Sequence, residues 1–245
     1  MSGTTGELSL TELRRNEFVT AFQNVKAKHD YKVLVMDARS IKILKTMLNT
    51  GELAETRIVR FEKLGNYREP AQDKDVIYFL TPSPQSIREV ITDFTPGPNN
   101  PTGKRYGFAH LYFTSALNGA LFEMVKASSA IGHIGTLTEL CIEYETFDQK
   151  VFLAQLANCP LYRIYSPFKL NNNASEFDLM AKKIVNVCDA LNIVPVVRYF
   201  NPPEEFVPDC KARPLARMVE DEVRRRSGGP SSSSINRARR LGKPE

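Results

Sequence analysis

Apolar runs that alternate with amphipathic stretches dominate the first half of the chain, and the clearest example lies at 31–48. Val33 to Met36 are all apolar, which is the pattern of a strand buried on both faces. Asp37 ends this run, and apolar residues then recur at helical spacing at Ile41, Leu44 and Leu48. A buried strand that leads through an acidic corner into an amphipathic helix predicts the first unit of a parallel α/β sheet.

The same alternation continues to about residue 142. Further strands are expected at 57–61, 75–80 and 106–114, and further helices at 10–28, 85–94 and 120–128. Residues 134–140 are expected to return toward the sheet, with Cys141 to Tyr144 as the last strand. Strands that alternate with helices in this way predict a doubly wound parallel sheet, an α/β fold.

The pattern becomes looser in the second half. Helices are expected at 177–191 and 211–226, and a strand at 194–199, where Pro195 favours an edge position. These elements are too few to close a second sheet, so 143–226 is interpreted as an incomplete second α/β domain after a first domain at 10–142. Residues 1–9 are expected to be flexible, and 227–245 to form a disordered basic tail.

The distribution of charge along the chain argues against one class of partner, nucleic acid. The 245 residues include 33 Lys and Arg against 28 Asp and Glu, a net charge of +5. Residues 211–245 hold ten basic and four acidic residues, or +6, so the preceding 210 residues carry −1. A nucleic-acid-binding domain concentrates basic charge on its folded part, so no nucleic-acid partner is expected.

The cysteines and the hydropathy pattern indicate an intracellular protein. The four cysteines form no C-x-x-C pair and are expected to be free thiols in a reducing compartment: Cys141, Cys159, Cys188 and Cys210. No apolar run approaches the ~18 residues that span a bilayer, and no signal peptide is recognised. The chain is therefore expected to be soluble and cytoplasmic.

Candidate catalytic chemistry is sparse. Asp37 could be a phosphoacceptor at a strand end, but that chemistry needs Mg²⁺ and further carboxylates, and Met36 and Ala38 supply none. The glycine-rich nucleotide motifs are absent, and His110, inside a strand, is interpreted as a core imidazole. No enzyme, metal or cofactor is expected. The alternative left open is a phosphoacceptor or small-molecule enzyme on a flavodoxin-like sheet centred on Asp37.

Seven segments, in order, carry a resemblance to a known family. They are YKVLVMDARSIKIL from Tyr31, REP at 68–70, VIYFLTPSPQSIREVITDF from Val76, AHLYFTSALNGALFEMVKAS from Ala109, TLTELCIEY from Thr136, YSPF at 165–168 and VVRY at 196–199. From about residue 10 to about 220, the chain resembles the Sec-one/Munc-eighteen family, the SM proteins that bind syntaxin-type SNAREs. It is most similar to the exocytic, plasma-membrane branch.

The resemblance implies a non-enzymatic regulator of vesicle docking and membrane fusion in exocytosis and intracellular protein transport. Its partner would be a syntaxin-type SNARE, alone or in an assembled SNARE complex. The protein would be cytoplasmic and would reach the plasma membrane or secretory vesicles peripherally, through its partners. Members of the family are more than twice as long, which implies that this chain is an amino-terminal fragment.

The family binds syntaxin in two places, and the resemblance carries both onto this sequence. The first is one wall of a central cleft, implied here at Asp37, Ile41, Lys42, Glu62, Arg68 and Glu69. The second is an apolar pocket for the N-terminal peptide of syntaxin, implied at Leu117, Phe122, Ile134 and Leu137, with Glu139 at its edge. Alternating charges in the cleft would govern register and association rate more than affinity.

Overall fold

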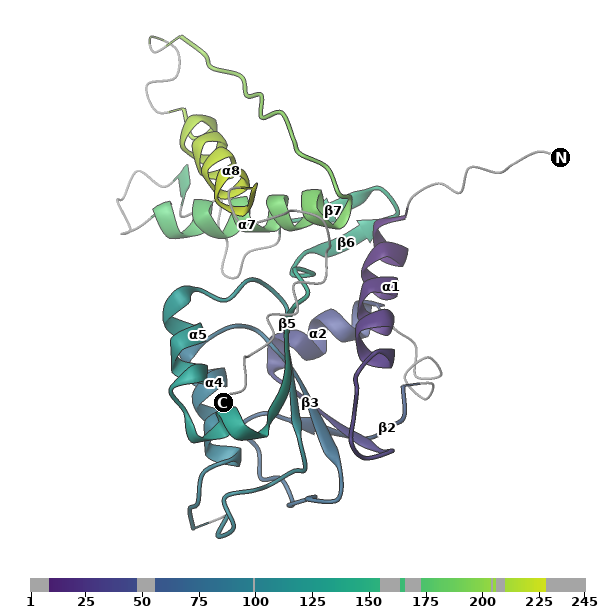
Figure 1. Cartoon of the computed structure of the whole chain (residues 1–245). Coiled ribbons are helices and arrows are strands. Elements are labelled where there is room, and N and C mark those ends of the chain that lie inside the picture. The colour runs from purple at the N-terminus through teal and green to yellow at the C-terminus, as the bar shows by residue number, and fades with distance from the viewer. Residues whose placement is uncertain are drawn as a thin grey trace, which may run out of the picture. The chain divides into compact units, whose positions relative to one another are not determined.

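A computed structural model describes residues 9–47, 56–98, 100–154, 164–165, 173–203, 205 and 210–227 (Figure 1). These residues divide into two compact units. The first, which we call the sheet unit, is built on Thr11–Cys141. The second, the helical unit, contains the described residues from Ile142 onward together with Ser9 and Leu10. None of the described helices is both long enough and apolar enough to cross a membrane.

Five parallel strands form the centre of the sheet unit, in the order β2-β1-β3-β4-β5. Their bounds are β1 Lys32–Met36, β2 Ile58–Lys63, β3 Asp75–Leu80, β4 Ala109–Phe113 and β5 Ile134–Glu139. Every residue of β1, β3 and β4 is buried, as the unbroken apolar runs indicated, whereas the edge strand β2 alternates between buried and exposed positions. The expected α/β fold with a parallel sheet is confirmed.

The last strand of the sheet differs from the expectation. β5 pairs with β4, whereas 141–144, which were expected to be the last strand, lie outside the ladder. Cys141 has a positive φ of 52°, which interrupts the extended backbone before Ile142. Ile142 and Tyr144 are nevertheless buried, so their apolar character reflects burial of a loop and not strand pairing.

Helices make most of the connections between the strands, and α4 and α5 follow residues whose side chains cap them. Ser83 Oγ accepts the N–H of Ser86 at 3.0 Å, and Asn118 Oδ1 accepts the N–H of Leu121 at 2.8 Å. The elements are α1 Leu10–Gln23, α2 Ala38–Met47, α4 Pro84–Asp93, α5 Gly119–Lys126 and the 3-10 helix η1 Ser129–His133. α1 ends five residues before the expected Lys28, which leaves a loop that leads into β1.

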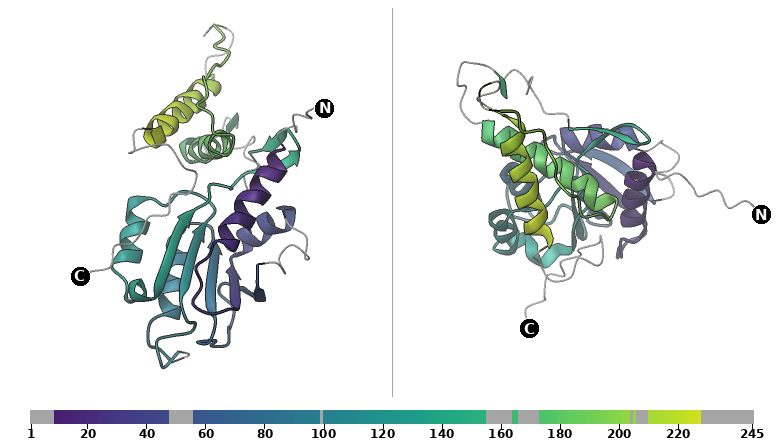
Figure 2. Two further views of the ribbon diagram at one scale, coloured as in Figure 1. Left: turned by 45° about the vertical axis from the view of Figure 1, so that its right-hand side comes forward. Right: turned by 90° about the horizontal axis from the view of Figure 1, so that it is seen from above.

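The helices cover both faces of the sheet, with α4 and α5 on one side and α1 and α2 on the other (Figure 2). On the α1 side, the rings of Phe18 and Phe22 pack edge-on against Phe79, at centroid distances of 5.1 and 6.0 Å. On the other side, Ile87 and Val90 of α4 join the apolar cluster under β1, β3 and β4. Because the sheet is buried on both faces, its central strands do not alternate between apolar and polar residues.

Asp75, the first residue of β3, fixes the amino end of the sheet. Its buried carboxylate accepts the backbone N–H groups of Lys28 (2.5 Å), His29 (3.2 Å) and Phe108 (2.9 Å), and Nδ1 of His29 lies 2.8 Å away. Burial opposes ionisation, but the bonds from His29, Lys28 and Phe108 outweigh it and lower the pKa of Asp75. A Cβ at Gly107 would lie 2.8 Å from Asp75 Oδ1, so only glycine fits there.

His110 lies in β4 beside this carboxylate and is 2% exposed, in agreement with its interpretation as a core imidazole. Its Nδ1 is 3.2 Å from Thr136 Oγ1, and its Nε2 is 3.9 Å from Asp75 Oδ2. Burial lowers the pKa of His110 to about 4, since the opposing effect of Asp75 is smaller. The imidazole is therefore neutral in the folded protein at neutral pH.

Two helices, α7 Asn173–Ala190 and α8 Ala212–Ser227, form the core of the helical unit. Ala181 and Val185 of α7 pack with Val219 of α8. At the end of α8, Arg226 donates from Nη1 to Asn186 Oδ1 at 2.9 Å and also pairs with Asp189 of α7. A two-stranded antiparallel hairpin, β6 Glu145–Asp148 and β7 Val151–Leu153, belongs to the same unit.

The strand expected at 194–199 is absent, because this stretch has no regular secondary structure. Val194 and Val196 are 78% and 80% exposed, whereas Val197 packs against the core of α7 and α8. β-branched residues favour a strand only where a neighbouring strand can pair with them. None of the strands that the structure describes pairs with this stretch.

We predict that His110 makes the stability of the sheet unit depend on pH between about 6.5 and 4. Its pKa is lower in the folded than in the unfolded chain, so the unfolded chain binds more protons in this range and stability falls on acidification. The full loss is ~3 kcal/mol. Denaturant unfolding at several pH values measures the slope, which should flatten in His110→Gln. An unchanged slope in that variant would contradict the assignment.

Candidate partner-binding surface

Asp37 ends β1 and fixes the start of α2. Its Oδ1 accepts the backbone N–H groups of Arg39 (2.9 Å) and Ser40 (2.7 Å), which caps the helix. Its Oδ2 accepts the N–H of Thr81 at 2.6 Å, in the turn that follows β3. Asp37 is half-buried, and both of its oxygens bond to backbone. It therefore positions α2, and the helix dipole favours its negative charge at this site.

The residues of α2 that were expected in the cleft wall lie within its first two turns. Lys42 is exposed and Ile41 is half-buried. Ser40, in contrast, is buried, and its Oγ accepts the N–H of Asp37 at 3.0 Å. A lysine beside a partly exposed isoleucine offers a partner both a charge and an apolar contact.

A loop without a helix, residues 64–74, makes the crossover between the parallel strands β2 and β3. We call it the crossover loop. Ala71 lies in the main apolar cluster and donates its N–H to the carbonyl of Arg105 at 2.7 Å. Tyr67 and Glu69 point outward, with Tyr67 80% exposed. The loop thus has a buried inner side and an exposed outer side.

Asp93, at the end of α4, holds the crossover loop in place. It is 1% exposed and accepts Nη1 and Nη2 of Arg68 at 2.6 and 3.2 Å. Nε of Arg105 lies 2.8 Å from the same carboxylate, and the hydroxyl of Tyr78 donates to it at 2.6 Å. Arg105 also donates to the carbonyl of Arg68. One buried carboxylate therefore joins the loop, α4, β3 and the segment before β4.

Two groups that donate to Asp93, the Tyr78 hydroxyl and the Arg68 guanidinium, have raised pKa values. Desolvation, together with Asp93, raises the pKa of the Tyr78 hydroxyl. Desolvation by itself would lower the pKa of Arg68, but Asp93 outweighs it and the pKa is raised. Both groups remain protonated at any ordinary pH and act as donors to the carboxylate.

Glu62 of β2 lies beside this cluster and is anchored on two sides. Nε of Arg60 approaches Glu62 Oε1 at 2.7 Å, and the hydroxyl of Tyr106 donates to Oε2. Burial and then this bond raise the pKa of Tyr106, because the neutral hydroxyl is the donor. Glu62 is half-buried, so its charge is held in a fixed position.

The structure leaves most of the residues expected in the cleft wall at least partly exposed, with one correction. Arg68 was expected among the surface charges, but it is 6% exposed and its guanidinium is occupied by Asp93. The sequence shows only that Arg68 lies in a charged loop, and it does not reveal that Asp93, 25 residues later, binds its guanidinium. Sequence reasoning also missed Tyr67, a single aromatic residue without periodicity. The remaining candidate surface consists of Asp37, Ile41, Lys42, Glu62 and Glu69.

The residues expected to bind an N-terminal peptide lie in α5, in β5 and in the loop before α5, and they differ in exposure. Leu117 and Leu137 are 7% and 1% exposed and belong to the main apolar cluster. Phe122 and Ile134 pack against that cluster and are half-buried. Glu139 Oε1 accepts the N–H of Leu117 at 3.1 Å, which closes the loop before α5. Only Phe122, Ile134 and Glu139 are therefore partly accessible.

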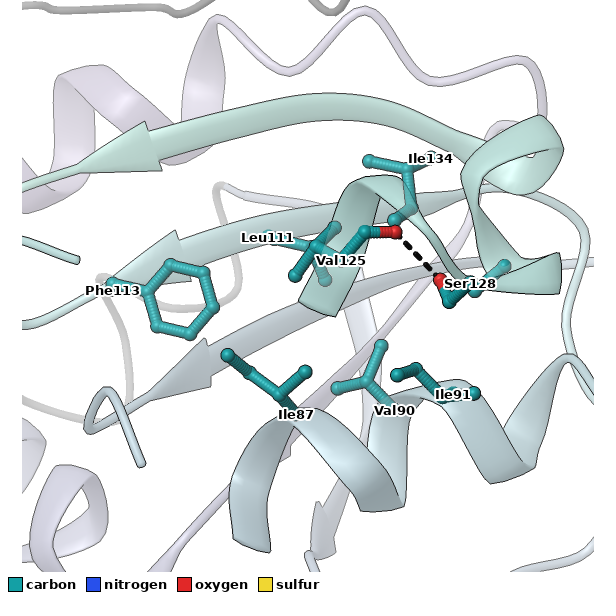
Figure 3. Close-up of a pocket in the computed structure, with 9 residues that line it drawn as sticks. Ile87, Val90, Ile91, Leu111, Phe113, Val125, Ser128 and Ile134 are labelled. Atoms are coloured by element: carbon teal, nitrogen blue, oxygen red, sulfur yellow. Dashed lines mark hydrogen bonds between the residues drawn. The ribbon is translucent and has the colours of Figure 1, made fainter. Parts of the chain in front are cut away.

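A small cavity of about 10 Å³ lies among α4, β4, α5 and β5 (Figure 3). Ile87, Leu111 and Val125 line it, and Ile134 is the one residue of the expected peptide pocket that reaches it. The volume is about that of one water molecule, too small for a side chain of a partner. It is a gap in core packing and not the peptide pocket.

The fold is that of an α/β protein with a parallel sheet, and its candidate site is the charged surface beside β2. A model of the Sec1 family matches residues 32–241, most of the chain, and the chain belongs to this family. The protein transport protein sec1 of Dictyostelium discoideum is 28% identical over 174 residues, which cover 71% of this chain. The same alignment covers 28% of that relative, so the chain spans little more than a quarter of its length.

Solved structures have the same fold. The Unc18–syntaxin 1 complex from Monosiga brevicollis matches with a TM-score of 0.69 and 20% identity, over 90% of this chain and 36% of that one. Sly1p in complex with an N-terminal peptide of Sed5p matches with a TM-score of 0.69 and 18% identity, over 89% of this chain and 38% of that one.

We predict that Arg68 is required for stability. Arg68→Ala leaves the buried Asp93 without its bidentate partner, a change that typically costs ~3–5 kcal/mol. Arg88→Ala, which removes an exposed arginine from α4, is the matched control and should change stability by less than ~0.5 kcal/mol. Urea unfolding measures both. Equal stability of the two variants would contradict the structural role of Arg68.

Proposed function

We propose that this chain is the amino-terminal part of an SM protein and binds a syntaxin-type SNARE, alone or within an assembled SNARE complex. The single observation that carries the proposal is the anchored charged surface of the sheet unit. Family membership supports it, as do the matched structures whose printed titles name syntaxin 1 and a Sed5p peptide. Residues 10–142 would be the first domain of such a protein and 143–226 the beginning of a second.

The surface suits recognition of a helical partner. Lys42 and Glu69 present opposite charges from two different elements, and Glu62 is held between Arg60 and Tyr106. Charges fixed by buried contacts lose little side-chain entropy on binding, and opposite signs favour one register over others. Tyr67 adds an exposed aromatic ring, a residue type enriched at binding hot spots.

The finer parts of the proposal concern location. We infer action in exocytosis, in the cytoplasm and at the plasma membrane or secretory vesicles. The relative from Dictyostelium discoideum, a protein transport protein, supports a role in transport. The alternative, in which Asp37 is a phosphoacceptor, is less favoured, because both carboxylate oxygens bond to backbone N–H groups. Phosphorylation there would break the cap of α2.

We predict that the double reversal Lys42→Glu with Glu69→Lys lowers affinity for the cytoplasmic region of syntaxin by about tenfold or more. Both side chains are exposed, so the melting temperature should hardly change. Isothermal titration calorimetry measures the affinity. The control, Asp178→Lys with Lys182→Glu, reverses an exposed pair on α7 without a change in net charge. Equal affinities of the two variants would refute this surface.

We predict that Phe122→Ala weakens binding of a labelled N-terminal syntaxin peptide by about tenfold, because it removes the accessible aromatic ring of the proposed pocket. Met124→Ala is the matched control, since Met124 lies on the same helix and packs at the periphery of the same cluster. Fluorescence anisotropy reports binding, and thermal unfolding corrects for lost stability. If both variants bind the peptide as the unaltered chain does, the peptide site lies elsewhere.

A further inference from the structure

The five segments that lead into the strands each bring a basic side chain to the same end of the sheet. These residues are Lys28 before β1, Arg57 before β2, Lys74 before β3, Lys104 before β4 and His133 before β5. Parallel strands all begin at one edge, so the segments lie next to one another in the order of the strands. Lys26 belongs to the same loop as Lys28. We call this end the amino edge; it lies toward the bottom of Figure 1.

Carboxylates neutralise only part of this charge. Asp30 lies 3.8 Å from Arg57, and Asp73 pairs with Lys74. Lys26, Lys28 and Lys104 form no ion pair with any residue that the structure describes. The buried Lys32 and Asp75 at this end offset each other. The five lysines and arginines against Asp30 and Asp73 therefore leave a net charge of +3, with His133 neutral.

Two of the unpaired ammonium groups share one aromatic ring. Lys28 Nζ lies 3.5 Å from the centroid of the Phe108 ring, and Lys104 Nζ lies 5.9 Å from it. The backbone N–H groups of Lys28 and Phe108 both donate to the buried Asp75. The fold therefore brings these two cations close together before any ligand is present. Burial and then the charge of Lys104 lower the pKa of His133.

The candidate partner surface carries a smaller excess. Its carboxylates, Asp37, Glu62 and Glu69, together with the basic residues beside them, Arg39, Lys42, Arg60 and Lys63, leave a net charge of +1. The contrast matters because mixed charges suit a partner that must bind in one register, whereas charge of one sign suits an anionic surface. The two regions therefore differ in the kind of partner that they fit.

We propose that the amino edge is a docking surface for an anionic lipid bilayer. Its cations are distributed over the full width of the sheet, roughly 19 Å for five strands, and not gathered in a groove. A bilayer offers anionic headgroups at every point, so such a distribution needs no fixed register. Tyr31, which is 57% exposed just before β1, and the half-buried Phe108 supply the aromatic side chains that favour the headgroup region.

The experiment is sedimentation of the full chain with vesicles of phosphatidylcholine, with or without phosphatidylserine. Each lysine near an anionic bilayer contributes roughly fivefold to partitioning, so Lys28→Gln with Lys104→Gln should lower binding to phosphatidylserine vesicles roughly 25-fold. Lys45→Gln with Arg88→Gln removes the same charge from exposed positions of α2 and α4 that belong to neither surface and is the control. It also corrects for the basic residues of 228–245, which remain in every variant. Lys26→Gln with Lys104→Gln repeats the test without removing the ammonium that lies closest to Phe108.

The proposal is supported if both amino-edge variants lose more binding to phosphatidylserine vesicles than the control does, at equal melting temperatures. Equal binding of all variants overturns it. Unchanged vesicle binding with weaker retention on heparin would assign the edge to a different polyanion and would also overturn it. Syntaxin capture by the same variants separates this result from the proposed function, which requires only the surface beside β2.

Discussion

The bidentate pairing of Arg68 with Asp93 is the contact on which the rest of the sheet unit depends. Two parallel strands, β2 and β3, are joined here by a loop, which cannot satisfy its own backbone groups as a helix would. The carboxylate of Asp93 compensates by gathering two arginines and a tyrosine from three other elements. A buried charge cluster of this kind is costly to break, so the loop is held as firmly as the strands beside it.

This arrangement separates residues that build the surface from residues that can bind. In the sequence, Asp37 and Arg68 cannot be told apart from Lys42 and Glu69, since all four are charged and lie in the segments that connect the strands. In the fold, the first two bond to buried or backbone groups, and the last two reach solvent. The rigid pair thus holds the exposed pair in position, which reduces the entropy lost when a partner binds.

Sequence reasoning predicted the sheet because its central strands are buried on both faces, and this leaves continuous apolar runs. It failed where local pattern and tertiary context disagreed. Residues 194–199 have strand-forming side chains but no described neighbour to pair with, and 141–144 are apolar because a loop is buried. The contacts of Asp93 with Arg68 and Arg105 could not be predicted, since ion pairs between residues distant in the chain leave no periodic signal.

The close fit at Gly107 has a genetic consequence. Any missense change there places a side chain against Asp75 and His29, both remote from the surface beside β2. The altered protein would retain every residue of that surface and still be depleted in the cell, because a loss of one or two kcal/mol is enough to raise its turnover. A trafficking defect caused by such an allele would therefore track protein abundance, and growth at lower temperature would relieve it.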